Sequence, residues 1–144
     1  MTTWLVFNYK VPYEPSARRV FVWRKLKGMG AIAVQDAAWV LPANARTREK
    51  MQWLASEVQE MGGEAILWEA TQLFTGQSVD LVAQFQKQVD ALFEKILRAL
   101  KKKNPDLAAL SRAYQHAKLQ DYFQSELGEQ VRQGLLEKRG QGES

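Results

Sequence analysis

The sequence predicts an α+β protein, and three observations support that class. Short runs of apolar, aromatic and β-branched residues alternate with longer amphipathic stretches over roughly the first seventy residues. Glycine, proline and asparagine residues separate these runs, as expected at turns and helix ends. From Ser78 onward, apolar residues recur at helical spacing. We therefore expect strands and helices together in the first half of the chain and helices alone in the second.

The first half is expected to contain, in order, a strand, a helix, two strands, a helix and a strand. Pro15 opens the first helix and Gly30 ends it, while Asn44 caps the second helix and the Gly62-Gly63 pair ends it. This βαββαβ order is that of the ferredoxin-like, or split-βαβ, arrangement. It predicts a four-stranded antiparallel sheet with both helices on one face. The four strands are expected over residues 4–9, 31–34, 38–41 and 64–69.

The second half is expected to form a helical hairpin. Apolar residues recur at alternating steps of three and four from Val82 to Ala99, and three lysines then suit the negative end of the helix dipole. Asn104, Pro105 and Asp106 supply a cap, a first-turn proline and a first-turn acid for the next helix. The expected organisation is a ferredoxin-like α+β unit over residues 1–72, a helical hairpin over 73–139 packed on it as one integrated domain, and a frayed tail over 140–144.

Composition narrows the class of protein. The 144 residues are 46% hydrophobic and 25% charged, which is ordinary for a folded globular chain. There is no cysteine, so disulfides and cysteine-ligated metal centres are excluded, and a reducing, cytoplasmic location is expected. The apolar run before Asn8 holds four residues, too few for a signal-peptide core or a membrane span. We expect a protein that does not enter the membrane.

Charge is distributed in three bands along the chain. Residues 10–50 hold nine lysines and arginines against three acids, a net charge of +6. Residues 57–94 hold seven acids against one lysine, a net of −6, and residues 95–144 hold ten bases against six acids, a net of +4. Such bands can place a positive surface opposite a negative one, although solvated surfaces would give the same pattern. An anionic partner is therefore permitted but not required.

Two arginines near the start of the first helix are candidates for binding an oxyanion. On a helical wheel of about 100° per residue, Arg18 and Arg19 fall within roughly 60° of the apolar stripe that should face the sheet. Helix N-termini also present free N–H groups and partial positive charge. The pair could therefore bind phosphate or an oxyanion such as sulfate or chromate. The alternative is an ion pair with Glu14, Asp36 or another acid.

Six further cations lie on the two helices expected in the first half, where they could contact the phosphate backbone of duplex DNA. Basic helix surfaces are common, so a solvated surface is the alternative. Val20 and Phe21 lie on the outward side of the first helix near some of these cations, and we expect the helical hairpin or a dimer partner to cover them. The six cations are Arg24, Lys25, Lys27, Arg46, Arg48 and Lys50.

No pattern of residues predicts catalysis, a bound metal or a cofactor. His116 is the single histidine, and no serine or aspartate spacing makes it part of a triad. Glu57 and Glu60 share a helix face, but nothing positions further ligands beside them, so a solvated face is expected. The tryptophans are expected to pack mainly in the core. They are Trp4, Trp23, Trp39, Trp53 and Trp68.

Segments spread over nearly the whole chain carry a family resemblance. They are WLVFNYKVPYEPS, RRVFVWRKLKGMGA, VQDAAWVLPA, WLASEVQEMGGEAILWEA and LQDYFQSELGEQVRQGLLE. These segments resemble the N-terminal domain of ChrB-type chromate-resistance proteins. The resemblance implies a cytoplasmic regulator of chromate-resistance genes whose N-terminal part binds promoter DNA. The residues that match the basic-aromatic helix of the family are Arg18, Arg19, Trp23, Arg24 and Lys25.

ChrB-type proteins usually continue into a second domain thought to respond to the oxyanion. The resemblance of this chain does not extend to that domain, so it does not imply chromate sensing by this chain. The leading expectation is a DNA-binding transcriptional regulator that acts as a homodimer through its helical hairpin or its sheet edges.

Two alternatives come from other classes of protein. The first is a metal-dependent nuclease, because the βαββαβ unit is similar to the small ferredoxin-fold proteins of CRISPR adaptation. Those proteins carry an acidic residue near the end of the first strand, where this chain has Phe7, Asn8 and Tyr9 and no carboxylate to hold magnesium. The second alternative is an oxyanion-binding adaptor that uses Arg18 and Arg19 without any DNA.

Overall fold

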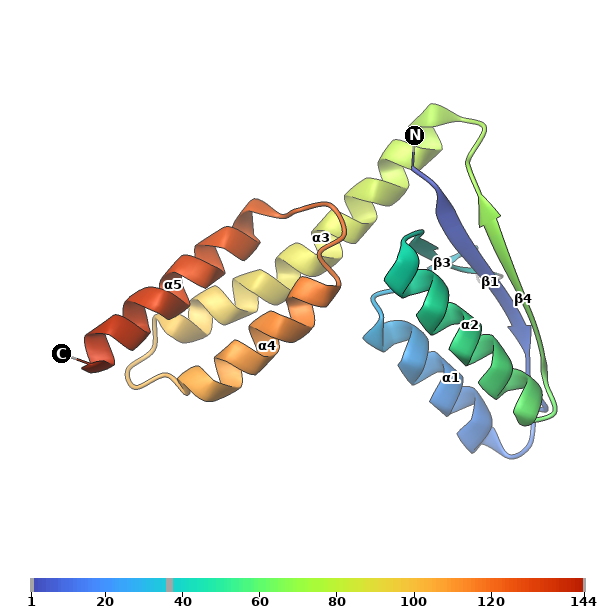
Figure 1. The fold of residues 1–144 in the computed structure, drawn as a ribbon, viewed down its shortest axis with the longest axis horizontal. Helices are drawn as coiled ribbons and strands as arrows, with labels where there is room; N and C mark the ends of the chain where they lie inside the picture. Colours follow the sequence, from blue (N-terminus) through green and yellow to red (C-terminus); the bar gives the residue numbers. More distant parts are fainter. Residues whose placement is uncertain (1, 36–37, 144) are drawn as a thin grey trace. The chain divides into compact units, whose positions relative to one another are not determined.

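The computed structural model describes residues 2–35 and 38–143. Over these residues the chain forms four strands and five helices, in the order β1, α1, β2, β3, α2, β4, α3, α4, α5 (Figure 1). It divides into two compact units, which we call unit 1 (Met1–Ser78) and unit 2 (Val79–Ser144). The expected α+β class is confirmed, with every described strand in the first half of the chain.

Unit 1 contains one four-stranded sheet. Its strand order is β2-β3-β1-β4, and each neighbouring pair is antiparallel, so β2 and β4 are the edge strands. The βαββαβ succession and the antiparallel sheet are confirmed, whereas the ferredoxin-like classification stays a prediction. The elements are β1 (Trp4–Lys10), α1 (Ser16–Gly28), β2 (Ile32–Val34), β3 (Ala38–Pro42), α2 (Ala45–Glu60) and β4 (Glu64–Ala70).

Helices α1 and α2 contact each other and lie on the same side of the sheet (Figure 1). Side chains alternate between the two faces of a strand. Leu5 and Phe7 of β1 are buried, and they point to the face opposite that of Val6, which is in register with the exposed Trp68 of β4. The sheet therefore buries one face under the helices, and its other face carries exposed apolar residues over β4.

The start of α2 is held by side-chain hydrogen bonds. The Asn44 side chain accepts from the Thr47 N–H at 2.9 Å, and the Thr47 hydroxyl oxygen accepts from the Asn44 N–H at 2.9 Å. This reciprocal capping box confirms Asn44 as the N-cap. The Thr47 hydroxyl also donates to the Pro42 carbonyl at 2.7 Å, which ties the end of β3 to the first turn of α2.

The end of α2 requires glycine at two consecutive positions. Gly62 has φ of +85°, a left-handed conformation that side chains disfavour. A Cβ atom on Gly63 would overlap the carbonyl oxygen of Lys10 and lie 3.0 Å from the Val58 side chain. The chain therefore passes from α2 into β4 only because its backbone can approach β1 this closely.

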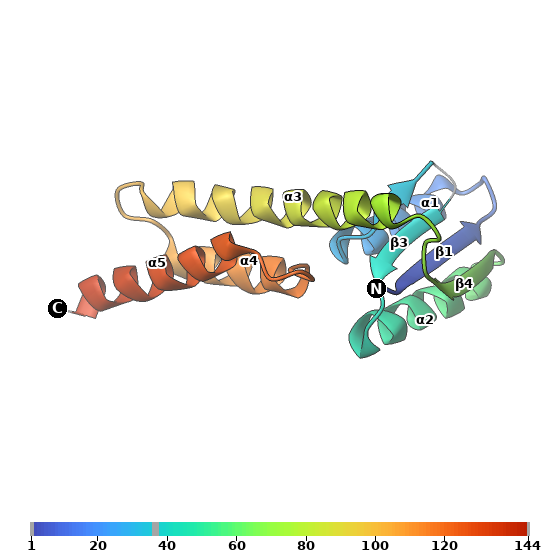
Figure 2. The same cartoon turned by 90° about the horizontal axis from the view of Figure 1, so that it is seen from above.

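Unit 2 is built from three helices rather than from a hairpin of two. They are α3 (Thr75–Leu100), α4 (Leu107–Leu119) and α5 (Glu126–Glu143), and α3 begins in the last residues of unit 1. Figure 2 shows α4 and α5 alongside α3. The three helices share one apolar core, made of Val89, Phe93, Ile96, Leu100, Tyr114, Ala117, Val131 and Leu135.

The expected two-helix hairpin is wrong because polar contacts interrupt the apolar stripe after Gln120. The Asp121 carboxylate accepts from the Ser125 N–H at 2.8 Å, and Gln124 has a left-handed φ of 50°. The Ser125 hydroxyl hydrogen-bonds the Asp90 carboxylate of α3 and accepts from the Leu127 N–H at 3.2 Å. These contacts end one helix and start the next, as local side-chain hydrogen bonds do at helix caps.

Two expected helix ends are also placed differently. Asp106, not Asn104, caps α4: its carboxylate accepts from the Ala109 N–H at 3.1 Å, whereas Asn104 has φ of 54° in the preceding turn. Helix α5 continues to Glu143, into the segment where a frayed tail is expected. Within residues 2–35 and 38–143, no helix has the length and apolar character needed to cross a bilayer.

The close approach at Gly63 makes a testable prediction. We expect Gly63→Ala to lower the free energy of unfolding by about 1–3 kcal/mol, because the new methyl group meets backbone that cannot move away cheaply. Gly76→Ala is the matched control, since a Cβ there meets nothing within 4 Å. Urea titrations of the two variants check this, and equal stabilities would contradict the close approach.

Candidate nucleic-acid interface

Helix α1 presents a cluster of uncompensated positive charge. Its thirteen residues include five cations and no acid. Arg19 and three cations of the later turns are exposed, while Arg18 is half-buried. In the part of the chain that the structure describes, none of the five is paired with a carboxylate. The three later cations are Arg24, Lys25 and Lys27.

Aromatic rings hold two of these cations along the helix surface. The Lys25 ammonium lies 5.4 Å from the centre of the Phe21 ring, and the Lys27 ammonium lies 5.8 Å from that of the Trp23 ring. Such contacts contribute about 0.5–1 kcal/mol at exposed sites and leave the positive charge unneutralised. They are not among the sequence predictions, although an aromatic residue four positions before a lysine is visible in the sequence.

Arg19 interacts with two tyrosines. Its guanidinium carbon lies 4.3 Å from the centre of the Tyr13 ring. Its charge also reaches Tyr9 at the end of β1: burial raises the pKa of the Tyr9 phenol above its ordinary value, and the nearby Arg19 charge partly opposes that rise. Positive charge at the start of α1 is therefore coupled to the end of the first strand.

Arg18 has a different partner, in the backbone of another helix. Its Nη1 atom donates to the Met61 carbonyl, just after α2, at 2.9 Å. No ion pair with Glu14 forms, and the expected alternative partner Asp36 lies outside the described residues. The two arginines expected to share an oxyanion thus have separate partners, and an oxyanion pocket between them stays a prediction.

The same hydrogen bond shows how the two helices run. Because the start of α1 lies beside the end of α2, antiparallel helices place the end of α1 beside the start of α2, as Figure 1 shows. Lys50 is exposed in that part of α2. Arg46 is half-buried and has a contact of its own within the chain. The end of α1 and the start of α2 therefore lie beside each other, and both carry exposed cations.

Arg48 is separated from that region. Its Nε atom is 2.6 Å from the Glu69 carboxylate on β4, and both side chains are 47% exposed. Arg48 lies about 200° from Lys50 around the helix, on the opposite side. Of the six cations expected to contact phosphate, Arg48 is thus neutralised by a carboxylate of the same chain.

Three tryptophans expected in the core lie on the surface. Trp23, Trp53 and Trp68 are 49%, 65% and 56% exposed. The core prediction is wrong for these three because an apolar residue indicates burial only where another element covers it. Trp4, by contrast, is buried.

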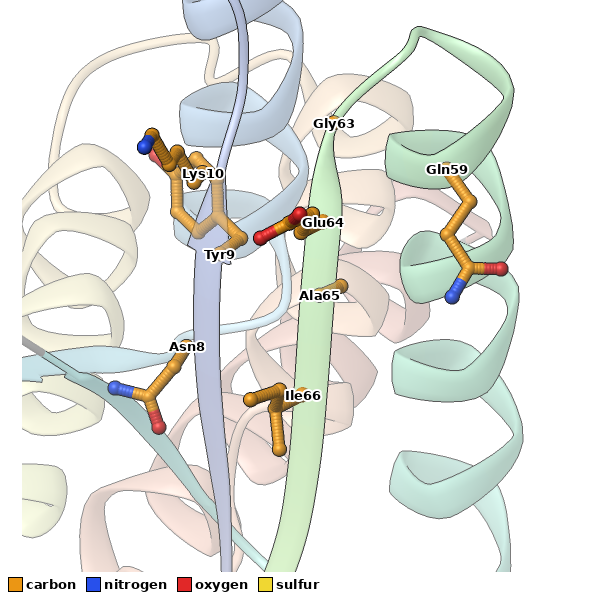
Figure 3. Close-up of a pocket in the computed structure, with 8 residues that line it drawn as sticks. All are labelled: Asn8, Tyr9, Lys10, Gln59, Gly63, Glu64, Ala65 and Ile66. Carbon is orange, nitrogen blue, oxygen red and sulfur yellow. The ribbon is translucent and has the colours of Figure 1, made fainter.

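Two of the hollows that the described residues line lie in unit 1. One, of about 570 Å³, runs along the outward side of α1, where Val20 and Phe21 lie beside Arg24 and Lys25. The other, of about 480 Å³, lies at the end of β1 and the start of β4 (Figure 3). Its lining residues are Asn8, Tyr9, Lys10, Gln59, Gly63, Glu64, Ala65 and Ile66. The first hollow therefore combines apolar surface with positive charge.

The second hollow has mixed chemistry. Lys10 and Glu64 are opposite each other in the strand register, and Figure 3 shows both at the strand ends.

Among the described residues, no three histidine, aspartate or glutamate side chains gather as a metal site. His116, in unit 2, has its Nε2 atom 3.0 Å from Gln120 Nε2. The nuclease alternative stays a prediction.

The fold and the surface together define a class of small α+β proteins that expose a basic helix beside an antiparallel sheet. The family model described as "Protein ChrB, N-terminal" matches residues 19–131, so this chain belongs to that family. The expected resemblance to the ChrB N-terminal domain is confirmed.

Protein ChrB of Cupriavidus metallidurans is 27% identical to this chain over 89 residues, which cover 62% of this chain. The match spans 28% of the length of that relative. No solved structure matches the chain.

The coupling between Arg19 and Tyr9 makes a prediction about pH. Because folding favours the neutral phenol, we expect the free energy of unfolding to fall as the pH rises above about 10, where exposed tyrosines ionise. Arg19→Gln should raise the pKa of Tyr9 further, since it removes the opposing charge. Ultraviolet difference titration against Tyr9→Phe measures this, and Arg24→Gln serves as the control. A Tyr9 pKa unchanged by Arg19→Gln would contradict the coupling.

Proposed function

We propose that this chain binds duplex DNA through α1 and the start of α2, as the DNA-binding part of a transcriptional regulator of chromate-resistance genes. The observation that carries the proposal is that Arg24, Lys25 and Lys27 are exposed in the last turns of a helix without acids and have no carboxylate partners among the described residues. Membership of the ChrB N-terminal family supports the regulatory role.

The chemistry of the surface suits a phosphate backbone. Lysine and arginine that approach phosphates release condensed counterions, which drives binding at low salt. The ring contacts of Lys25 and Lys27 keep both ammonium groups on the helix surface while leaving them charged. Lys50 is exposed near the start of α2, the helix end that lies beside the end of α1, and adds a further positive charge. Each of Arg24, Lys25, Lys27 and Lys50 can therefore contact a phosphate without first losing an internal ion pair.

Apolar side chains among these cations could contact bases. An α-helix fits into the major groove of B-form DNA, where apolar groups meet thymine methyl groups. Val20 is 43% exposed and lies in the same hollow as Arg24 and Lys25, and the ring of Trp23 is exposed beside Lys27. We therefore propose that the cations position α1 on DNA and that Val20 and Trp23 contact the bases in the major groove.

The salt dependence of binding tests the proposal. We expect the combined variant Arg24→Gln, Lys25→Gln, Lys27→Gln to reduce the slope of log K against log salt by about 2–3, since each phosphate contact contributes about 0.9. Fluorescence anisotropy with promoter duplexes at several salt concentrations measures the slope. Circular dichroism shows whether each variant is folded.

The matched control changes the same number of charges elsewhere. Lys101, Lys102 and Lys103 are exposed in the turn after α3. Their replacement by glutamine should leave the slope within about 0.5 of the wild-type value, since they lie outside the proposed surface. Equal losses in the two triple variants, or salt-independent binding by the wild type, would reject the proposed surface.

A second pair of variants compares two cations of α2. Lys50→Gln should reduce the slope by about 1, whereas Arg48→Gln should leave it nearly unchanged because Glu69 already neutralises Arg48. The same anisotropy titrations measure both. A larger effect at Arg48 than at Lys50 would move the interface to the other side of α2.

A further inference from the structure

Strand β4 is a long edge strand. Its seven residues pair with β1 without a break, from Ala70 opposite Trp4 to Glu64 opposite Lys10. In the described part of the chain, no strand lies on its other side. The opposite edge of the sheet is formed by β2, which has three residues. The two edges therefore differ: one is short, and the other offers a full row of backbone groups.

Strand β4 lacks several of the features that usually protect an edge, and its charged residues are the two glutamates Glu64 and Glu69. Proteins guard edge strands with proline, with lysine, with bulges or by shortening them. The sequence EAILWEA contains no proline and no cation, and its continuous register with β1 excludes a bulge. Ile66 and Trp68 are 53% and 56% exposed on the sheet face away from the helices. An edge of this kind is a template for another strand.

The sequence of β4 is complementary to itself in one antiparallel register. We propose that β4 pairs with β4 of a second copy of this chain about a two-fold axis at Leu67. In that register, Ile66 of each copy is opposite Trp68 of the other, which places two apolar pairs side by side. Glu64 is opposite Ala70, and Glu69 is opposite Ala65, so no like charges meet.

Other registers fit less well. In an antiparallel pair related by a two-fold axis perpendicular to the sheet, residues opposite each other must point to the same face of the sheet. Because side chains alternate along a strand, this holds only when both residue numbers are odd or both are even. An axis at Glu69 would place that carboxylate opposite its own copy. The axis at Leu67 alone pairs all seven residues of both strands. The second copy would extend the sheet to eight strands and bury the exposed pair Ile66 and Trp68.

This pairing is independent of DNA binding, so its test uses the full chain without DNA. Ala70 is exposed and is opposite Trp4 within its own sheet, where a new charge finds no charged partner. Across the proposed interface it is opposite Glu64, twice in each dimer. We expect Ala70→Glu to weaken dimerisation and Ala70→Lys to strengthen it, so that the dissociation constants differ roughly ten-fold or more.

Sedimentation equilibrium measures the two dissociation constants, and circular dichroism shows that both variants are folded. The difference should shrink in about 1 M salt, where the Debye length falls to about 3 Å. A wild-type chain that stays monomeric at roughly 100 μM would overturn the pairing, because it would place the dissociation constant above that concentration. A dimer whose stability is the same in both Ala70 variants would do so as well, because it would use another surface.

A disulfide test defines the register. The chain has no cysteine, so each introduced thiol is unique. Glu64→Cys and Ala70→Cys proteins should cross-link when mixed, because opposite residues in antiparallel strands are about 4.5–5.5 Å apart between Cα atoms. Neither protein should cross-link with itself, since equivalent positions would lie about 20 Å apart along the strands. Efficient self-linking of either protein would refute this register.

Discussion

The packing of two helices on one face of the sheet is the constraint on which the rest of unit 1 depends. Helix α1 buries only a narrow stripe, in which Val22 and Leu26 are fully covered. A helix that buries one stripe must expose the remainder of its surface. In α1 that remainder includes five cations and two aromatic rings and no acid. The basic surface is therefore a direct consequence of which residues the sheet leaves uncovered.

The cations of unit 1 behave in two ways. Arg48 is paired with Glu69, and such an exposed pair contributes about 0.2–1 kcal/mol while cancelling the charge. Lys25 and Lys27 lie against aromatic rings, which stabilise their positions and keep their charge available. The distinction matters for any anionic partner, since a free cation needs only to exchange its counterions and a paired one must also lose its internal partner.

Unit 2 shows local polar contacts overriding a longer apolar pattern. By residue type the apolar stripe that begins in α4 continues through Tyr122 and Phe123, yet Asp121 and Ser125 end one helix and begin another. The hydrogen bond from Ser125 to Asp90 ties this turn to α3. Both aromatic rings instead contact Phe85 of α3, edge-on for Tyr122. Tyr122 and Phe123 therefore pack against α3 from the turn between α4 and α5 rather than from a helix.

What the sequence determined by itself was local. Runs of β-branched and aromatic residues, a capping asparagine and paired glycines predict the succession of elements in unit 1, because these signals act through neighbouring residues. The resemblance of several segments also predicts the family. The three-helix form of unit 2 was not predicted, since the contact between Ser125 and Asp90 joins residues far apart in the chain.

The tertiary structure decided which side chains are covered and which charges are cancelled. Trp23 and Trp68 are surface residues, and Trp4 is a core residue, because covering depends on the elements that pack over each position. Arg48 and Lys50 are two residues apart, yet only Arg48 meets the Glu69 carboxylate, because strand β4 brings that acid to one side of α2. Such contacts depend on the strand order, which spacing along one chain does not specify.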